Sequence, residues 1–361
     1  MAKEKKCVLE IGSSRVKLTG VEIVNGNAGR SFFKTYKHNG IKNNFFVNPE
    51  KLMSVIEKTL AEYEDAEGVQ LKDAYLVLPQ KFFRFSHDIS SIAIKNGVVN
   101  KFDVADIIES SLNEIEDCEK LKCVPIAFKV KDDYVDNPIG QECTEMSMVS
   151  VSEGILVRIN EFFNDISKRL GIRFVYVPTI EPMLDKLQNE LATNRSSRVA
   201  IYFSENYIDV CYCEMKAVIA EKTIEVGNSD FVDALAELNK TDYDTARELL
   251  GHINFNLDGG KYVVSGTETH VFDVNEVNSG IKKLYAYLAE EIKKALTVMT
   301  GDAVLPIYCA GEEIACVRGA DGLLTEKIGM PVSVLTPDSL LWNTPADYVM
   351  AGLVEKITEK D

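Results

Sequence analysis

A strand–turn–strand pattern opens this chain and returns near its middle. Val8–Leu18 reads as two strands around Gly12, and Val199–Glu214 reads as two strands around a second turn. In each case a third apparent strand and then helices follow, which is the pattern of an α/β lobe. A chain of 361 residues is also too long for one small core. The repeat therefore predicts two lobes related by an internal duplication.

Changes in composition and periodicity predict where the lobes begin and end. We expect the first lobe at 1–80 and 152–191, and the second at 192–361. The polar run 192–198 marks the boundary between them. A helical subdomain is expected within the second lobe at about 228–300.

Residues 81–151 interrupt the first lobe with a different pattern. They predict an inserted strand–helix–strand–strand subdomain. Its expected elements are the strand Phe82–Ile94, the helix Asp103–Glu114, and the strands Cys123–Lys131 and Glu145–Ser152.

The charge balance and the cysteine content exclude several classes of function for this chain. The chain has 56 acidic and 40 basic residues, so its formal net charge is -16. An acidic surface repels phosphate backbones and anionic lipids, so we expect no nucleic-acid partner and no membrane binding by charge alone. The eight cysteines contain no C-x-x-C pair and there are only four histidines, which argues against a zinc site. Without a signal peptide or a membrane-spanning run, we expect a cytoplasmic protein with reduced thiols.

The first turn has the residue types of a phosphate-binding loop. Gly12, Ser13 and Ser14 combine a glycine with two hydroxyls, which leaves backbone N–H groups free to face an anion. Arg15 and Lys17 add positive charge next to the turn. An ordinary hairpin turn is the competing interpretation of the same residues.

Five short motifs spread over nearly the whole chain point to a known family. Glu10–Val16 is close to the pattern D-I-G-T/S-x-K-V, and Asn137–Gly140 matches N/D-P-[VI]-G. Val226–Gly227, Ala246–Gly251 and Ala310–Gly311 occupy the places of three later motifs. In this order they resemble the actin-fold proteins and, among them, the cell-division FtsA family. The resemblance implies an α/β, two-lobed actin-like ATPase fold (ribonuclease-H-like, duplicated) with an inserted subdomain.

The resemblance also implies a nucleotide pocket and its residues. The cofactor-binding residues would be Gly12, Ser13, Ser14, Arg15, Asp209, Gly227 and Gly311. Glu10 and Asp209 would be the residues that organise a bound metal ion, with Glu10 in place of the family's aspartate.

Several residues of this pocket depart from the family pattern. The family's second phosphate loop, D-I-G-G-G-T-T-D, aligns with 202–209, where every glycine is absent and Glu205 lies on the phosphate path. Bulky Cβ groups keep a backbone away from phosphate, and a carboxylate repels it. Asn228 replaces a glycine, and Glu312 and Glu313 add two more carboxylates. We therefore expect a degenerate pocket with no cofactor and no ATPase activity, unless ATP and Mg²⁺ still fit.

The first functional hypothesis is an FtsA-like cytoskeletal adaptor in cell division that acts through protein–protein contacts. FtsA links polymers of FtsZ to the membrane, so the resemblance implies FtsZ-like or other division or pilus proteins as partners, and self-association into filaments. The chain stops at 354–361, after a core helix, without the amphipathic helix of FtsA. We therefore expect no direct membrane insertion, and recruitment to the inner face of the membrane by a partner.

Two alternatives stay open. PilM, a cytoplasmic component of type IV pilus or secretion machinery, has a similar insert, lacks the amphipathic helix, and binds a short peptide of a membrane protein beside the insert. The enzymatic alternative is an active actin-like ATPase. Phosphoryl transfer requires that phosphate charge be neutralised. Carboxylates have the wrong sign for this, and the expected pocket contains four: Glu10, Glu205, Glu312 and Glu313.

Overall fold

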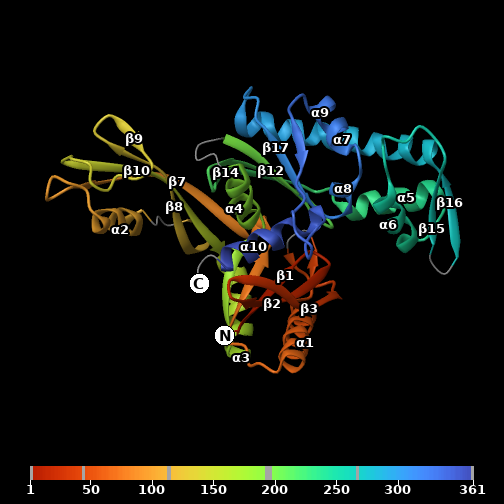
Figure 1. The fold of residues 1–361 in the computed structure, drawn as a ribbon, viewed down its shortest axis with the longest axis horizontal. Helices are drawn as coiled ribbons and strands as arrows, with labels where there is room; N and C mark the ends of the chain where they lie inside the picture. Colours follow the sequence, from red (N-terminus) through yellow and green to blue (C-terminus); the bar gives the residue numbers. More distant parts are fainter. Residues whose placement is uncertain (1–2, 43–44, 112–114, 192–196, 266–267, 359–361) are drawn as a thin grey trace.

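Two five-stranded sheets with the same topology form the centre of the molecule (Figure 1). The computed structural model describes residues 3–42, 45–111, 115–191, 197–265 and 268–358. In each sheet, three consecutive antiparallel strands are extended by two parallel strands that come later in the chain. This repeat confirms the predicted α/β fold with two duplicated lobes.

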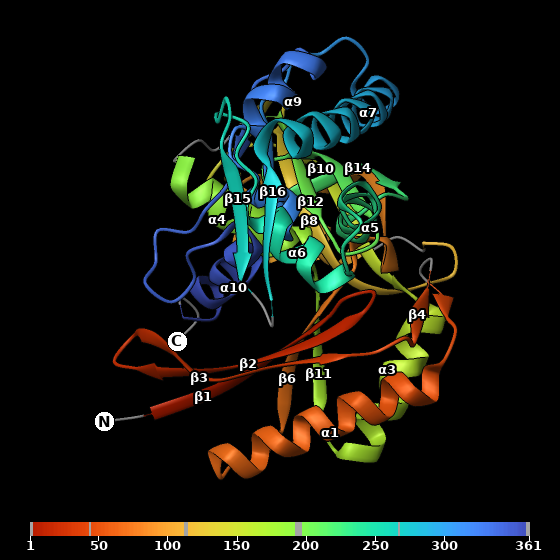
Figure 2. The same cartoon turned by 90° about the vertical axis from the view of Figure 1, so that its right-hand side faces the viewer.

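The first lobe is built on a sheet of order β11-β6-β1-β2-β3. Its strands are β1 (Lys3–Ile11), β2 (Arg15–Val24), β3 (Asn27–Lys37), β6 (Asp73–Leu78) and β11 (Arg173–Pro178). Figure 2 shows α1 and α3 on the side of this sheet that faces away from the second lobe. The helices are α1 (Pro49–Glu67), α3 (Val157–Leu170) and α4 (Ile180–Leu191), and a small hairpin joins β4 (Ile41–Lys42) to β5 (Phe45–Phe46).

The second lobe repeats this sheet in the order β14-β13-β12-β17-β18. Its strands are β12 (Ser197–Phe203), β13 (Ile208–Glu214), β14 (Ala217–Ile224), β17 (Ile307–Gly311) and β18 (Val332–Val334). Its helices are α5 (Asn228–Asn239), α6 (Tyr243–His252), α7 (Val274–Thr300), α8 (Glu313–Cys316), α9 (Ala320–Ile328) and α10 (Tyr348–Thr358). A separate hairpin joins β15 (Lys261–Ser265) to β16 (Thr269–Asp273).

The insert is a four-stranded sheet of order β7-β10-β8-β9 with one helix on it. It projects from one side of the molecule, and α5, α6 and the β15–β16 hairpin project from the other (Figure 1). A short 3-10 turn, Gln80–Phe82, leads from β6 into the insert. Its elements are β7 (Phe83–Ala93), α2 (Lys101–Ser110), β8 (Cys118–Val130), β9 (Asp133–Val135) and β10 (Glu145–Leu156).

Element boundaries differ from the predictions where local periodicity is ambiguous. β9 was not expected, and neither was the β15–β16 hairpin, because both consist of very short strands. The insert helix was predicted to end at Glu114, and in the structure it ends at Ser110. Residues 112–114 of the prediction lie outside the described residues. Most of the predicted linker, 192–196, also lies outside them.

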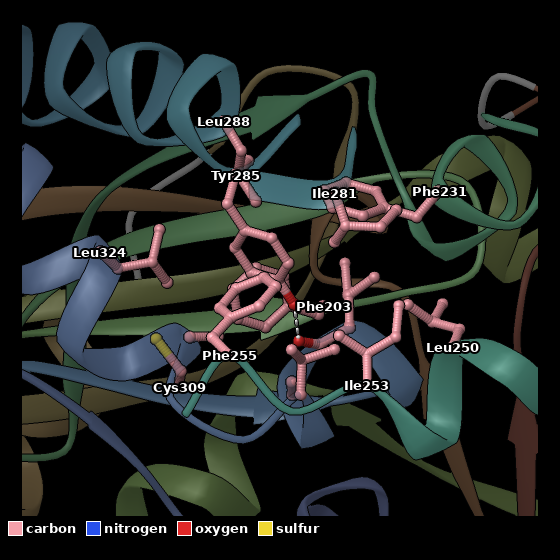
Figure 3. Packing of buried hydrophobic residues seen from close by; sticks show 14 of the residues in the cluster. Phe203, Phe231, Leu250, Ile253, Phe255, Ile281, Tyr285, Leu288, Cys309 and Leu324 are labelled. Atoms are coloured by element: carbon pink, nitrogen blue, oxygen red, sulfur yellow. Dashed lines mark hydrogen bonds between the residues drawn. The ribbon is translucent and has the colours of Figure 1, made fainter. Parts of the chain in front are cut away.

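Aliphatic side chains and a group of aromatic rings form the core of the second lobe (Figure 3). The Tyr285 ring packs edge-on against Phe231 and Phe255, with centroid distances of 5.2 and 5.4 Å. Its hydroxyl donates a hydrogen bond to the carbonyl oxygen of Ile314 at the start of α8. Because a buried hydroxyl needs such a partner, this bond ties α7 to the loop that carries Glu312 and Glu313.

A second cluster joins the two lobes. α4 and α10 pack together, and their apolar faces contact strands of both sheets, including Val8 of β1 and Ala200 of β12. Trp342, the single tryptophan of the chain, is buried in the same cluster. The lobes therefore share a continuous core on one side of the cleft between them. None of the described helices is both long and apolar enough to cross a membrane.

Candidate functional site

The first turn connects β1 to β2 at the cleft between the lobes. The N–H of Gly12 donates to the carbonyl oxygen of Arg15 (2.8 Å), so this donor is used inside the turn. His38 supports the turn, because its Nε2 donates to the carbonyl oxygen of Gly12 (3.0 Å) and the N–H of Gly40 donates to its Nδ1 (3.1 Å). Burial lowers the pKa of His38, in keeping with a neutral ring. The hydroxyl of Ser13 is buried and has no hydrogen-bond partner among the described residues.

The second loop lies opposite, between β12 and β13. Its carbonyl groups accept hydrogen bonds from the start of α5: Asn228 N–H donates to Ser204 O (3.0 Å) and Ser229 N–H to Glu205 O (2.8 Å). These are N–H groups that a helix otherwise leaves unpaired and that an anion could bind. Here the protein's own loop occupies them.

Two glycines of the predicted pocket are needed for close packing against this loop. A Cβ atom on Gly227 would lie 2.4 Å from the backbone nitrogen of Tyr207. At Gly311, where φ is +127°, a Cβ atom would lie 2.1 Å from the carbonyl oxygen of Phe203. Both glycines therefore allow two backbone segments to approach each other closely. In both cases the approaching segment is part of the protein's own chain and not a bound ligand.

Lys17 forms an ion pair across the cleft. It lies on β2 directly opposite Glu10 of β1, and its Nζ is 3.4 Å from Glu10 Oε1. The same Nζ is 3.0 Å from Glu312 Oε1, which follows β17 in the other lobe. Burial acts to lower the pKa of Lys17, but these two carboxylates hold it well above its usual value. Lys17 is thus a partly buried cation, with its side chain 18% exposed, and one carboxylate from each lobe neutralises it.

A second ion-pair group lies deeper in the second lobe. Arg247 of α6 pairs with Glu205 of the second loop and lies 3.8 Å from Glu313. The Tyr243 hydroxyl donates to Glu205 Oε1 (3.1 Å). Burial raises the pKa of Glu205, and the positive charge of Arg15 across the cleft opposes the rise. Arg247 therefore holds the Glu205 carboxylate in place with help from one phenol.

Asn228 stands where the family pattern has a glycine, and its side chain forms two hydrogen bonds. Its side chain is fully buried, and its Nδ2 donates to Glu313 Oε2 (2.7 Å) while its Oδ1 accepts from the N–H of Ile314 (3.0 Å). A glycine at this position could make neither bond. The replacement therefore fixes α8 and one of the added carboxylates.

Asp209 lies on β13, apart from these pairs. Its side chain is 2% exposed and accepts a hydrogen bond from the Thr223 hydroxyl (2.8 Å). Lys81, from the turn that leads into the insert, is buried nearby with its Nζ 4.0 Å from the centre of the Tyr207 ring. Burial raises the pKa of Asp209 to about 6, although Thr223 and Lys81 act to lower it.

One group of acidic side chains in the described part of the chain has the spacing of metal ligands. Among the described residues, Glu205, Glu312 and Glu313 are the group of three whose carboxylate oxygens lie within 4.8 Å of one another. Glu10 and Asp209 are not members of this group. Since Lys17 and Arg247 already neutralise carboxylates of the group, it does not offer the free oxygen cage that Mg²⁺ requires.

The open part of the cleft lies beside the first turn. A cavity of about 880 Å³ separates this turn from the second loop and the start of α5. It is lined by Ser13, Ser14, His38, Asn39, Ile41, Phe45, Val47, Asn206, Glu225, Ser229 and Asp230. Of the predicted pocket residues, the structure therefore places only Ser13 and Ser14 on this cavity.

The pairing of charges was the part of the site that sequence reasoning missed. Glu10, Lys17, Glu205 and Glu312 were each named from the sequence as residues at or beside the pocket, but not as partners of one another or of Arg247. Lys81 was missed entirely, because a lysine next to Gln80 in a short turn has no local signal of burial.

Comparisons with known proteins agree with this architecture. No protein-family model matches the chain. The cell division proteins FtsA of two Staphylococcus epidermidis strains, ATCC 12228 and RP62A, are 23% and 24% identical to it, each over 92% of this chain and 74% of the relative. A chain of the PilM–PilN type IV pilus biogenesis complex aligns with a TM-score of 0.61 at 14% identity, covering 97% of this chain and 98% of that chain. MreB5 of Spiroplasma citri bound to ADP aligns with a TM-score of 0.59 at 9% identity, covering 99% and 96%.

These similarities confirm two of the sequence-based predictions. The chain has the actin-like ATPase fold, and its resemblance to FtsA extends over nearly its whole length. The structural likenesses are all far below 25% identity, so they bear on the fold alone.

We expect Gly311→Ala to destabilise the protein by about 3 kcal/mol or more, because the methyl group would overlap the Phe203 carbonyl and φ is positive. Gly322→Ala is the matched control, since its Cβ would meet nothing within 4 Å on α9. The control should gain roughly 0.5–1 kcal/mol from helix propensity. Urea unfolding followed by circular dichroism measures both. Equal stabilities of the two variants would contradict the packing role of Gly311.

The raised pKa of Asp209 predicts that the stability of the folded protein depends on pH. Its carboxyl group stays neutral in the folded protein up to a pKa of about 6, whereas unfolded aspartate ionises near 3.8. The folded state therefore binds the extra proton, and the Asp209 contribution to stability falls as pH rises from about 4 to about 6. We expect Asp209→Asn to gain stability relative to the unmodified protein over this interval, by about 2–3 kcal/mol in total. A constant difference between the two proteins from pH 4 to pH 7 would refute this.

Proposed function

We propose that this actin-fold relative of FtsA is an adaptor in which internal ion pairs have replaced the nucleotide, and that it acts by binding other proteins. The observation that carries the proposal is the Lys17–Glu312 ion pair, which joins the two lobes across the cleft. In this proposal the contact between Lys17 and Glu312 holds the two lobes together in place of a bound nucleotide.

Electrostatics support the loss of nucleotide binding. A triphosphate in the pocket would bring several negative charges next to carboxylates of Glu10, Glu205, Glu312 and Glu313. Two like unit charges 4 Å apart repel by about 4 kcal/mol near a protein surface. Lys17 and Arg247 could neutralise phosphate only by leaving the carboxylates that they now pair with. Such an exchange would leave buried carboxylates unpaired, which is costly.

The likeness to FtsA supports a role in cell division. We propose an FtsZ-like protein or another division protein as the partner, and recruitment to the inner face of the membrane through a partner. Self-association into filaments belongs to the same proposal. With the lobes joined by an ion pair, filament formation would not depend on ATP.

We expect no heat of binding when the protein is titrated with Mg-ATP or Mg-ADP up to 1 mM ligand. Such a titration detects complexes whose binding free energy is about 4 kcal/mol or more favourable. Calorimetry on the full chain makes the measurement, and Arg15→Ala is the control because Arg15 is a basic residue of the first turn. Micromolar binding that is lost in Arg15→Ala would overturn the proposal and restore a nucleotide-dependent protein.

A PilM-like role is the second candidate, and one cavity favours it. The insert meets the two lobes around a cavity of about 440 Å³. It is lined by Lys122, Val124, Glu181, Asp185, Lys186, Asn189, Lys216, Gly352 and Lys356. The resemblance to PilM implies peptide binding beside the insert, and this cavity is in that place.

Two peptides distinguish the candidates. We expect the full chain to bind the C-terminal peptide of the FtsZ encoded in the same genome, and not the cytoplasmic N-terminal peptide of a pilus inner-membrane protein. Fluorescence anisotropy measures both affinities, with Lys122→Glu as the variant that places a carboxylate in the cavity beside the insert. Binding of the pilus peptide alone, weakened by Lys122→Glu, would favour the PilM-like role instead.

A further inference from the structure

A chain of alternating charges connects the insert to both lobes. Lys122 of β8 lies opposite Glu153 of β10, and its Nζ is 3.5 Å from Glu153 Oε2 and 2.5 Å from Glu181 Oε2 of α4. Lys356 of α10 also pairs with Glu181, and its Nζ lies 2.7 Å from Asp185 Oδ2 on the next turn of α4. Lys122 thus joins the insert to the first lobe, and Lys356 continues the chain of contacts to the second lobe.

Glu153 is the most buried member of this chain. Its side chain is 7% exposed, and it lines a small cavity of about 20 Å³, which has room for about one water molecule. Val124, Val151 and Leu184 are among the apolar walls of the cavity, and β7 places Phe85 opposite Glu153 in the sheet. A carboxylate in such surroundings is poorly solvated, so its charged form is disfavoured.

The charged groups that face Glu153 come from four elements. They are Lys122 of β8, Glu181 of α4, Lys356 of α10, and Lys216, which precedes β14 and lines the same small cavity. Burial raises the pKa of Glu153 from 4.5 to about 7; Lys122 opposes the rise and Glu181 adds to it. Burial also acts to raise the pKa of Glu181, but Lys122 and Lys356 hold it below its usual value. Glu153 is therefore the carboxyl group of this pair that changes charge near neutral pH.

We propose that Lys122 and Glu153 form a proton-controlled latch that ties the insert to α4. With Glu153 neutral, Glu181 alone holds the Lys122 ammonium group. When Glu153 loses its proton, its carboxylate competes for Lys122 and draws water into the apolar cavity, so the contact between the insert and α4 loosens.

The direction of the pH effect follows from which arrangement binds the proton. The tied insert keeps Glu153 protonated up to a pKa of about 7, whereas a solvated glutamate ionises near 4.5. The contribution of Glu153 to the tied arrangement is therefore fully present below about pH 4.5 and is lost as pH rises to about 7. The latch lies outside the cleft that contains Lys17, so it does not depend on what that cleft binds.

Energy transfer between two dyes measures the position of the insert in the full chain. A keto amino acid at Ile139 of the insert and at Val298 of α7 takes both dyes and leaves the eight native cysteines unlabelled. These two side chains are 51% and 86% exposed, so the dyes do not disturb the core. We expect a narrow distance distribution at pH 5 and a broader one at pH 8, with a midpoint near pH 7.

Matched variants assign this transition to the latch. Glu153→Gln keeps the size of the side chain but is neutral at every pH, so its distribution should stay narrow up to pH 8. Glu145→Gln changes an exposed glutamate of the same strand and should keep the transition of the unmodified protein. Lys122→Gln removes the ion pair with α4 and should give the broad distribution already at pH 5, whereas Lys122→Arg should restore the narrow one.

Two other groups near the root of the insert can change charge in the same interval. His87 donates a hydrogen bond to the carbonyl oxygen of Ile219 (2.7 Å), and histidine titrates near neutral pH. Glu221 lies 3.8 Å from Arg84, and burial raises its pKa to about 8. Both groups belong to the contact between the insert and β14. We therefore expect His87→Gln and Glu221→Gln to keep the midpoint near pH 7.

Three results would overturn the proposal. They are an unmodified protein whose distribution is the same at pH 5 and pH 8, an unchanged transition in Glu153→Gln, and a narrow distribution of Lys122→Gln at pH 5. Loss of the transition in His87→Gln or Glu221→Gln would also overturn it, because the contact with β14 would then control the insert. Circular dichroism checks that each variant is folded. If Glu153→Gln does not fold, the unmodified protein and the two Lys122 variants still decide the question.

Discussion

The ammonium group of Lys17 constrains this structure more than any other single group. It lies partly buried between the lobes, and a charge that is removed from water is stabilised when it is paired. Glu10 pairs with it from the neighbouring strand and Glu312 from the opposite lobe, so the lobes must stay close enough for both contacts. Other features serve the same contact: Gly311 lets the Glu312 loop approach Phe203, and Tyr285 and Asn228 hold the following helix.

The same residues explain how an actin-like fold can keep its shape with a changed pocket. Positions that resemble nucleotide-binding glycines remain glycine where two segments of the chain pack closely, at Gly227 and Gly311. The second loop has lost its glycines, and its carbonyl groups pair with the start of α5. The N–H groups at the start of α5 are thus paired within the protein itself.

Two hollows lie on either side of the insert root. One is the lysine-lined cavity where the insert meets α4 and α10, and the other is the groove between β14 and α7. The N-terminal half of β14 lies between them and contacts β7 of the insert.

The sequence by itself determined the elements and their order. Alternation and helical spacing are local properties, so the duplicated sheet pattern, the insert and helix α6 at Tyr243–His252 could be predicted from neighbouring residues. Motif spacing predicted a set of pocket positions, of which Ser13 and Ser14 line the cavity beside the first turn. The tertiary structure alone decided which charges pair. Lys17 and Glu312 are 295 residues apart in the sequence, and the carboxylates of Glu205, Glu312 and Glu313 come together from two separate segments. Contacts of this kind depend on how the lobes pack, and no local pattern in the chain encodes that distance.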